Sequence, residues 1–162
     1  MPKRRRSPDR LARNERPALS GIDELTIAAN GAEAGRASEW LATTFLRRNV
    51  PQALVERLAL CLHEVLANVV THGGSTALAA PIRLLLEVKL EQGRRLASVT
   101  VSDSGAAFNP LLAPKRPLPS TLDAASVGGL GLVMIRRCSD WLDYRHEGGR
   151  NHLTFGARWD VQ

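Results

Sequence analysis

The chain has 162 residues, 44% of them hydrophobic, which is enough for one domain with a buried core. Two cysteines far apart in the sequence, Cys61 and Cys138, give neither a disulfide framework nor a cysteine zinc cluster, and no stretch approaches the roughly 20 apolar residues of a membrane span. The formal net charge of +6 at pH 7 suggests nucleic-acid binding. Whether the domain itself is basic depends on where in the chain this charge lies.

The first segment of the chain is a basic tail. Residues 1–16 hold seven Lys or Arg and two acidic residues, whereas the rest holds 15 basic and 14 acidic residues. A segment so poor in apolar residues does not bury enough surface to fold. We therefore expect a disordered tail over residues 1–20, which solubilises the protein or weakly contacts an acidic partner, nucleic acid or membrane surface. Residues 21–162 should form a cytoplasmic domain without direct nucleic-acid or membrane binding.

The first predicted elements of the domain are one strand and two helices. A short β-like run covers residues 23–29, and apolar residues at helical spacing predict a helix over 33–49. A second helix is predicted over 51–72, because Pro51 is typical of a helix start and Gly73 of a helix end.

Two β-hairpins, a long loop and a third helix follow. Alternation and a Gln-Gly turn predict the first hairpin from residues 82–90 and 96–101. Four prolines without a clear period predict a loop over 109–127, of a length typical of functional or mobile loops. A third helix is predicted over 130–142. The last two predicted strands are residues 141–147 and 152–159. This order predicts a sheet with helices packed on one face.

Polar residues line one edge of the second predicted helix. At about 100° per residue, its apolar side chains form a core-facing stripe. Glu64, Asn68 and His72 follow the edge of that stripe at positions i, i+4 and i+8. A carboxylate and an amide placed there can meet a ligand, although a solvated helix edge has the same spacing. The H-E-x-x-H zinc motif is excluded, because Ala67 stands at its last position.

Two glycine-containing segments are further candidates for a site. Asp103 and Gly105 follow a β-run, so a carboxylate at a strand end precedes a position where a planar ligand can approach the backbone. A plain Asp-Ser-Gly turn is the alternative. Gly129 and Gly131 lie at the start of the third helix, where free N–H groups and the helix dipole favour an anion. A flexible hinge is the alternative there.

Together and in this order, the three patterns resemble the N, G1 and G2 boxes of the GHKL ATPase superfamily. The matching residues are Glu64-x-x-x-Asn68 with His72-Gly73, Asp103-x-Gly105-x-x-Phe108-x-Pro110, and Gly129-x-Gly131-Leu132. Within the superfamily the chain is most similar to the RsbW-type anti-sigma factor serine/threonine kinases. This similarity includes HEVLANVVTHGG (63–74), SDWLDY (139–144) and GRNHLTF (149–155), and covers about residues 22–158.

The resemblance implies the Bergerat ATP-binding fold, an α/β fold of the α+β two-layer type with a mixed, largely antiparallel sheet and helices on one face. It implies ATP and Mg²⁺ as ligands, with Asn68 binding Mg²⁺ and Glu64 as catalytic base or positioner. Asp103 would accept a hydrogen bond from the adenine amino group, and Gly105 would admit the base. The other implied ATP-binding residues are His72, Phe108, Gly129, Leu130, Gly131, Leu132 and Thr154.

The resemblance also implies that the 109–127 loop is an ATP lid, from which Lys115 or Arg116 would reach the terminal phosphate. Ala107 departs from the family pattern, because many relatives have a glycine there.

The implied activity is that of an ATP-dependent protein serine/threonine kinase. It would phosphorylate an anti-anti-sigma (STAS-type) protein and sequester a sigma factor, and a homodimer stays open. A non-catalytic module that switches partners in response to ATP is one alternative. A stand-alone histidine-kinase-type ATPase domain is another, but it predicts an upstream phosphoacceptor histidine, and residues 1–32 contain no histidine.

Overall fold

The computed structural model describes residues 21–113 and 130–160. The predicted tail over 1–20 and most of the predicted 109–127 loop therefore lie outside the described residues. None of the helices in the described part of the chain has the length and apolar character needed to cross a bilayer.

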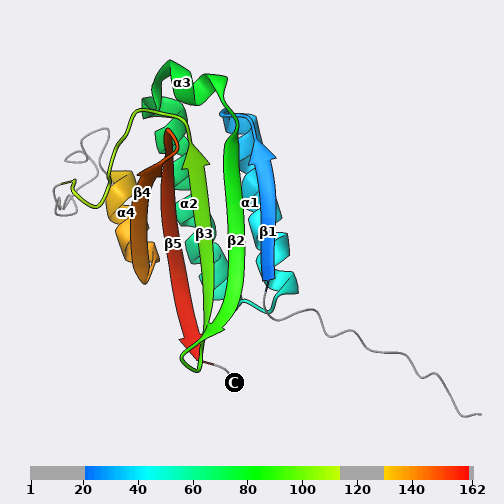
Figure 1. The fold of residues 1–162 in the computed structure, drawn as a ribbon. Helices are drawn as coiled ribbons and strands as arrows, with labels where there is room; N and C mark the ends of the chain where they lie inside the picture. Colours follow the sequence, from blue (N-terminus) through cyan, green and yellow to red (C-terminus); the bar gives the residue numbers. More distant parts are fainter. Residues whose placement is uncertain (1–20, 114–129, 161–162) are drawn as a thin grey trace, which may run out of the picture.

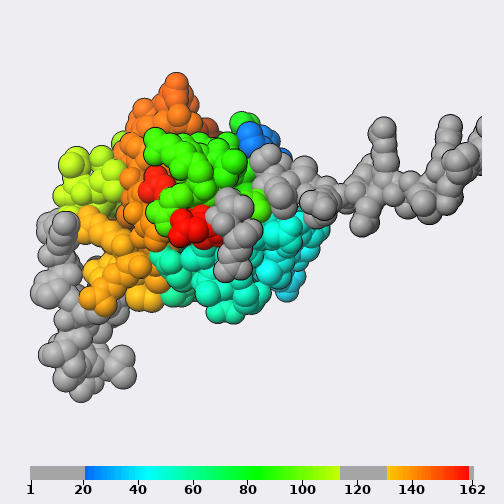
Figure 2. Space-filling view, turned by 90° about the horizontal axis from the view of Figure 1, so that it is seen from below, coloured from blue at the N-terminus to red at the C-terminus, as the bar shows by residue number. Residues whose placement is uncertain are grey.

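The fold has two layers, a five-stranded sheet and a layer of helices on one of its faces. Figure 1 shows the strands side by side, with the helices behind them. Seen from below in Figure 2, the first two helices lie together on one side of the strands. In chain order the elements are β1 (Gly21–Ile27), α1 (Gly31–Arg47), α2 (Gln52–His72), α3 (Gly74–Ala79), β2 (Ile82–Glu91), β3 (Arg94–Asp103), α4 (Leu130–Cys138), β4 (Trp141–Glu147) and β5 (Arg150–Asp160).

The strand order is β1-β2-β3-β5-β4, and every pairing among the described strands is antiparallel. The expected two-layer α+β fold is confirmed, and the sheet is antiparallel throughout these pairs rather than mixed. Alternate strand residues such as Leu84, Val99 and Phe155 face the helices and are buried with Phe45 and Leu62. In the helical layer, α2 packs between α1 and α4.

Local signals set most of the element ends. The Asn30 side chain caps α1 by accepting a hydrogen bond from the Glu33 N–H at 3.0 Å, so the helix begins two residues earlier than predicted. In the two hairpin turns, Gln92 with Gly93 and Gly148 with Gly149 all have positive φ, as type I′ turns require.

Other features also differ from the sequence prediction. Strand β1 covers Gly21–Ile27 rather than 23–29. The third helix ends at Cys138 rather than at 142, because the Asp140 N–H already donates to the Gly156 carbonyl of β5, at 2.8 Å. The short helix α3 was not predicted. It begins at Gly74, whose φ of +76° allows the chain to turn sharply after α2.

An ion pair joins the helical layer to the start of β4. Arg57 of α2 donates to Asp140 Oδ1 at 2.8 Å, and the Arg158 N–H donates to Oδ2 at 2.8 Å. Partial burial alone would raise the pKa of Asp140, but these two donors outweigh it and hold the pKa below its usual value. The ionised carboxylate is therefore favoured in the folded state.

We predict that Asp140→Asn lowers the free energy of unfolding by about 1 kcal/mol at pH 7, since the pair is partly exposed and screened. The pKa is lower in the folded than in the unfolded chain, so this stabilisation is complete above the unfolded pKa. It disappears as the pH falls through the folded pKa. Urea unfolding at pH 7 and at about pH 3 measures both effects.

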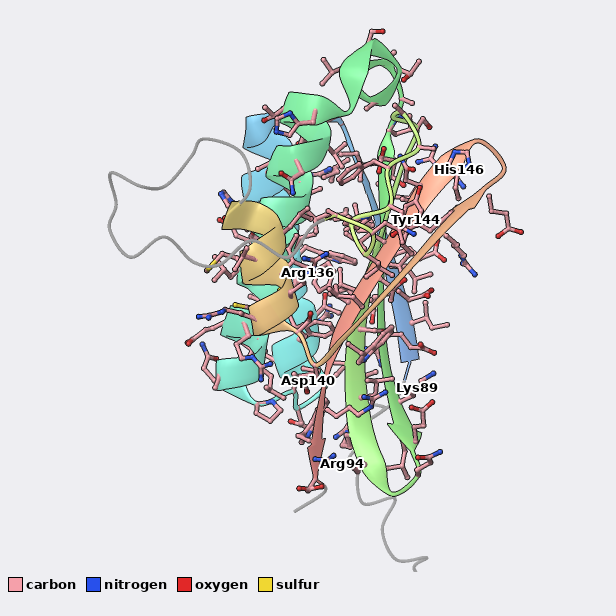
Figure 3. The ribbon with its side chains drawn as sticks, turned by 90° about the vertical axis from the view of Figure 1, so that its left-hand side faces the viewer. Lys89, Arg94, Arg136, Asp140, Tyr144 and His146 are labelled. Atoms are coloured by element: carbon pink, nitrogen blue, oxygen red, sulfur yellow. The ribbon has the colours of Figure 1, made fainter. Side chains whose placement is uncertain are left out.

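The matched control is Asp160→Asn. Asp160 also pairs with an arginine, Arg94, at 2.9 Å, but the Asp160 side chain is 82% exposed. Figure 3 labels Arg94 and Asp140. This variant should unfold like the wild type. Equal effects of the two substitutions at both pH values would contradict the prediction.

Candidate functional site

A cavity of about 440 Å³ opens between the helical layer and one end of the sheet. Its walls come from the second half of α2, the end of β3 with the segment after it, the start of α4, and the β4–β5 hairpin. The lining residues are Val65, Asn68, Val69, His72, Gly73, Asp103, Ala106, Ala107, Phe108, Pro110, Gly131, Leu132, Tyr144, Asn151 and Leu153. Most are apolar, and the few polar groups converge from separate elements, as in small-molecule sites.

The α2 edge brings Glu64 and Asn68 to the start of α4. A Cβ atom added at Gly131 would lie 2.9 Å from Glu64 Oε2 and 3.4 Å from Asn68 Nδ2. The glycine therefore lets α4 approach these two side chains closely. Both are half-buried, and neither makes a hydrogen bond with another described residue. His72 lies further along the same edge, lines the cavity and is exposed.

At the opposite wall, β3 ends in a buried carboxylate. Asp103 is 8% exposed, and its Oδ1 accepts the Gly105 N–H at 2.8 Å. A Cβ atom at Gly105 would lie 2.9 Å from the Gly73 carbonyl oxygen and 3.0 Å from Gly73 Cα, so only glycine fits here without displacing backbone. The end of α2 and the turn after β3 are thus in direct backbone contact.

Sequence reasoning missed two residues of the β4–β5 hairpin. Asn151 lies opposite Asp103 in the β3–β5 register and donates to Asp103 Oδ1 at 3.0 Å. Tyr144 donates to Asn151 Oδ1 at 2.8 Å. The sequence placed Asn151 just before a strand, whereas β5 begins one residue ahead of it, at Arg150. Both residues belong to segments that carry the family resemblance, SDWLDY and GRNHLTF, but no site role was assigned to them there.

Arg136 of α4 is a third missed residue. Its Nη2 donates to the carbonyl oxygens of Pro110 at 2.8 Å and Ala113 at 2.9 Å. Figure 3 labels this side chain, which projects from α4. It ties α4 to the last described residues of the segment that follows β3.

Not every expected site residue reaches the cavity. Thr154 lies on the other face of the sheet, because its neighbours Leu153 and Phe155 face the cavity and the core. Its hydroxyl pairs with that of Thr100 at 2.9 Å. Phe108 and Leu132 do line the cavity. Leu130 is the first residue of α4, and its side chain is not described. Gly129, Lys115 and Arg116 lie outside the described residues.

Asn68 is a candidate metal ligand in this cavity. Within residues 21–113 and 130–160, no group of three His, Cys, Asp or Glu converges on a point that could hold a metal ion. Asn68 nevertheless fits Mg²⁺, an ion usually held by one or two protein oxygens together with substrate phosphates. Its amide borders the cavity and makes no hydrogen bond to other described residues.

Cys61 has no part in this chemistry. Burial, followed by the influence of the neighbouring Cys138, raises the pKa of its thiol to about 12. The thiol therefore stays neutral near pH 7 and behaves as a packing residue between α2 and α4.

The chain is similar to known proteins in sequence and in fold. The family described as the histidine kinase-like ATPase domain matches residues 27–156. The serine/threonine-protein kinase BtrW of Bordetella bronchiseptica is 36% identical over 135 residues, which are 83% of this chain and 92% of BtrW. Among solved structures, the RsbU and RsbW domains of Rv1364c from Mycobacterium tuberculosis match with a TM-score of 0.56 at 16% identity. That match covers 88% of this chain but only 34% of the other, and it concerns the fold alone.

We predict that Gly105→Ala destabilises the protein by about 1–3 kcal/mol, because the added methyl group meets backbone atoms of Gly73 that cannot move independently. The same displacement should shift Asp103 and weaken nucleotide binding. Chemical unfolding and calorimetric titration with ATP measure the two effects. Gly35→Ala is the control, because a Cβ atom at this α1 position meets nothing within 4 Å. An unchanged unfolding midpoint in Gly105→Ala would contradict the proposed contact.

Proposed function

Since the chain belongs to the family of histidine kinase-like ATPase domains, we propose that it is an ATP-dependent protein serine/threonine kinase. Its substrate would be an anti-anti-sigma protein of the STAS type, and it would also sequester a sigma factor. The likeness to the kinase BtrW over most of both chains supports this proposal. The observation that carries it is the convergence of Glu64, Asn68 and Gly131 at one end of the cavity that Asp103 lines at the other.

The two ends of the cavity suit the two ends of ATP. A buried carboxylate in largely apolar surroundings suits an adenine, with Asp103 accepting a hydrogen bond from the amino group. Asn68 and the start of α4 suit the phosphates, because N–H groups at a helix N-terminus favour anions. Bound there, Mg²⁺ would neutralise charge on the phosphates, and Asn68 would be its protein ligand.

Phosphoryl transfer would use Glu64. The carboxylate would accept the proton of a serine or threonine hydroxyl of the partner protein as that oxygen bonds to the γ-phosphorus. The bond between the γ-phosphorus and its bridging oxygen would break, and ADP would leave. Such a reaction depends chiefly on positioning and charge stabilisation, so one well-placed carboxylate can suffice. Its half-buried position beside Gly131 supports this role.

The partners follow from the same proposal. A sigma factor and its antagonist regulate transcription in the cytoplasm, and the kinase would act there. Phosphorylation would release the antagonist and free the kinase to hold the sigma factor. The same proposal includes a domain that begins near residue 21, after a basic tail. It also includes a homodimer.

Glu64→Gln is the decisive substitution. We predict that it lowers the rate of phosphoryl transfer by about 100-fold or more, because an amide does not accept the proton. ATP affinity should change less than about threefold, since Glu64 does not line the cavity. Transfer of labelled γ-phosphate to the co-expressed antagonist protein and calorimetric titration with ATP separate the two effects.

The control is Glu56→Gln, an exposed glutamate on the same helix that accepts a hydrogen bond from Gln52 at 2.9 Å. It should transfer phosphate at the wild-type rate. Transfer that survives in Glu64→Gln would contradict the role of Glu64. Tight ATP binding without transfer in the wild type would instead make the protein a partner-switching module.

A further inference from the structure

Asn151 is the most extensively bonded side chain around the cavity. It is 7% exposed, and its Nδ2 donates to Asp103 Oδ1 at 3.0 Å, to the Ala106 carbonyl at 3.1 Å and to the Gly105 carbonyl at 3.2 Å. Its Oδ1 accepts the Tyr144 hydroxyl at 2.8 Å. One side chain of β5 therefore holds the carboxylate and the backbone of the turn that follows β3.

The surroundings allow one orientation of this amide. All three neighbours on the Nδ2 side are acceptors, so an amide turned by 180° would place oxygen against oxygen three times. On the other side, Tyr144 supplies the hydrogen that Oδ1 accepts. The three acceptors therefore set the amide in the orientation that Asp103 needs, and the Tyr144 hydroxyl anchors its oxygen.

The network divides the two oxygens of Asp103 between two tasks. Oδ1 is engaged by the Gly105 N–H at 2.8 Å and by Asn151, whereas Oδ2 makes no hydrogen bond to another described residue. Two donors on Oδ1 fix the plane of the carboxylate. They also leave Oδ2 as an acceptor for a ligand N–H donor.

We propose that Tyr144 and Asn151 are positioning residues that give the site its preference for a purine with an exocyclic 6-amino group. This inference rests on the proposed ATP binding and adds to it the residues that make Asp103 selective. A site built to pair with a polar ligand group rejects an analogue that lacks the group, because its own buried group then stays unpaired. A carboxylate free to rotate would lose much of this discrimination.

The sheet register supports such precision. Asp103 pairs with Asn151 between β3 and β5, and Asn151 pairs with His146 between β5 and β4. Asn151 thus lies on a strand hydrogen-bonded on both sides. Tyr144 is two residues from His146 and points to the same face of β4. Its oxygen reaches Asn151 diagonally across the two strands.

The test compares ATP with purine riboside 5′-triphosphate, which lacks the 6-amino group, by calorimetric titration of the full chain. The wild type should bind ATP about tenfold more tightly than the analogue. Asn151→Ala should lose about tenfold in ATP affinity and little in analogue affinity, so that the preference falls to about one. Tyr144→Phe, which removes one oxygen, should reduce the preference about threefold.

Thr100→Val is the control, because it removes a hydroxyl hydrogen bond from the outer face of the same sheet, and it should keep the wild-type preference. Equal losses for ATP and analogue in Asn151→Ala and Tyr144→Phe would overturn the inference, since bracing of the turn alone affects both nucleotides. A wild type that binds both equally would overturn it while leaving the proposed kinase activity intact. A wild type that binds neither ATP nor the analogue would overturn both this inference and the proposed kinase activity.

Discussion

The contact between Gly105 and Gly73 is the constraint on which the site depends. It brings the turn after β3 against the end of α2 at backbone distance, where a Cβ atom would lie 2.9 Å from a carbonyl oxygen. Because the protein interior is closely packed, such a contact fixes the two elements relative to each other. The helix that carries Asn68 and the strand that ends in Asp103 are thereby held as the two walls of one cavity.

The other walls are connected to this contact by side chains. Asn151 joins β5 to the turn after β3, and Arg136 joins α4 to residues 110–113. Gly131 brings α4 against Glu64 and Asn68. Polar groups that would be isolated on single elements therefore act as one set, and most of the lining between them is apolar. That combination supports nucleotide binding more strongly than any one of the three sequence patterns.

Local and periodic signals carried most of the fold prediction. The Pro51 and Gly73 boundaries located α2 to within one residue, and the glycine turns located both hairpins. Asn68, Asp103 and Gly131 were found because they belong to patterns of fixed spacing. Asn151 and Arg136 were not, because their roles depend on strand register and helix placement, which no local spacing encodes. The resemblance implied a site role for Thr154, although the apolar neighbours on either side already indicated that its side chain lies on the other face of the sheet.

The turn at Gly148 and Gly149 has a consequence for how this domain can diverge. Successive strand residues alternate between faces, so a shift of one residue exchanges the two sets of side chains. A one-residue insertion in this turn that slips β5 past β3 would carry Asn151 to the outer face and bring Arg150 opposite Asp103. Evolutionary change at this hairpin is therefore confined to substitutions and register-preserving insertions, and the length of a surface turn becomes part of the nucleotide site.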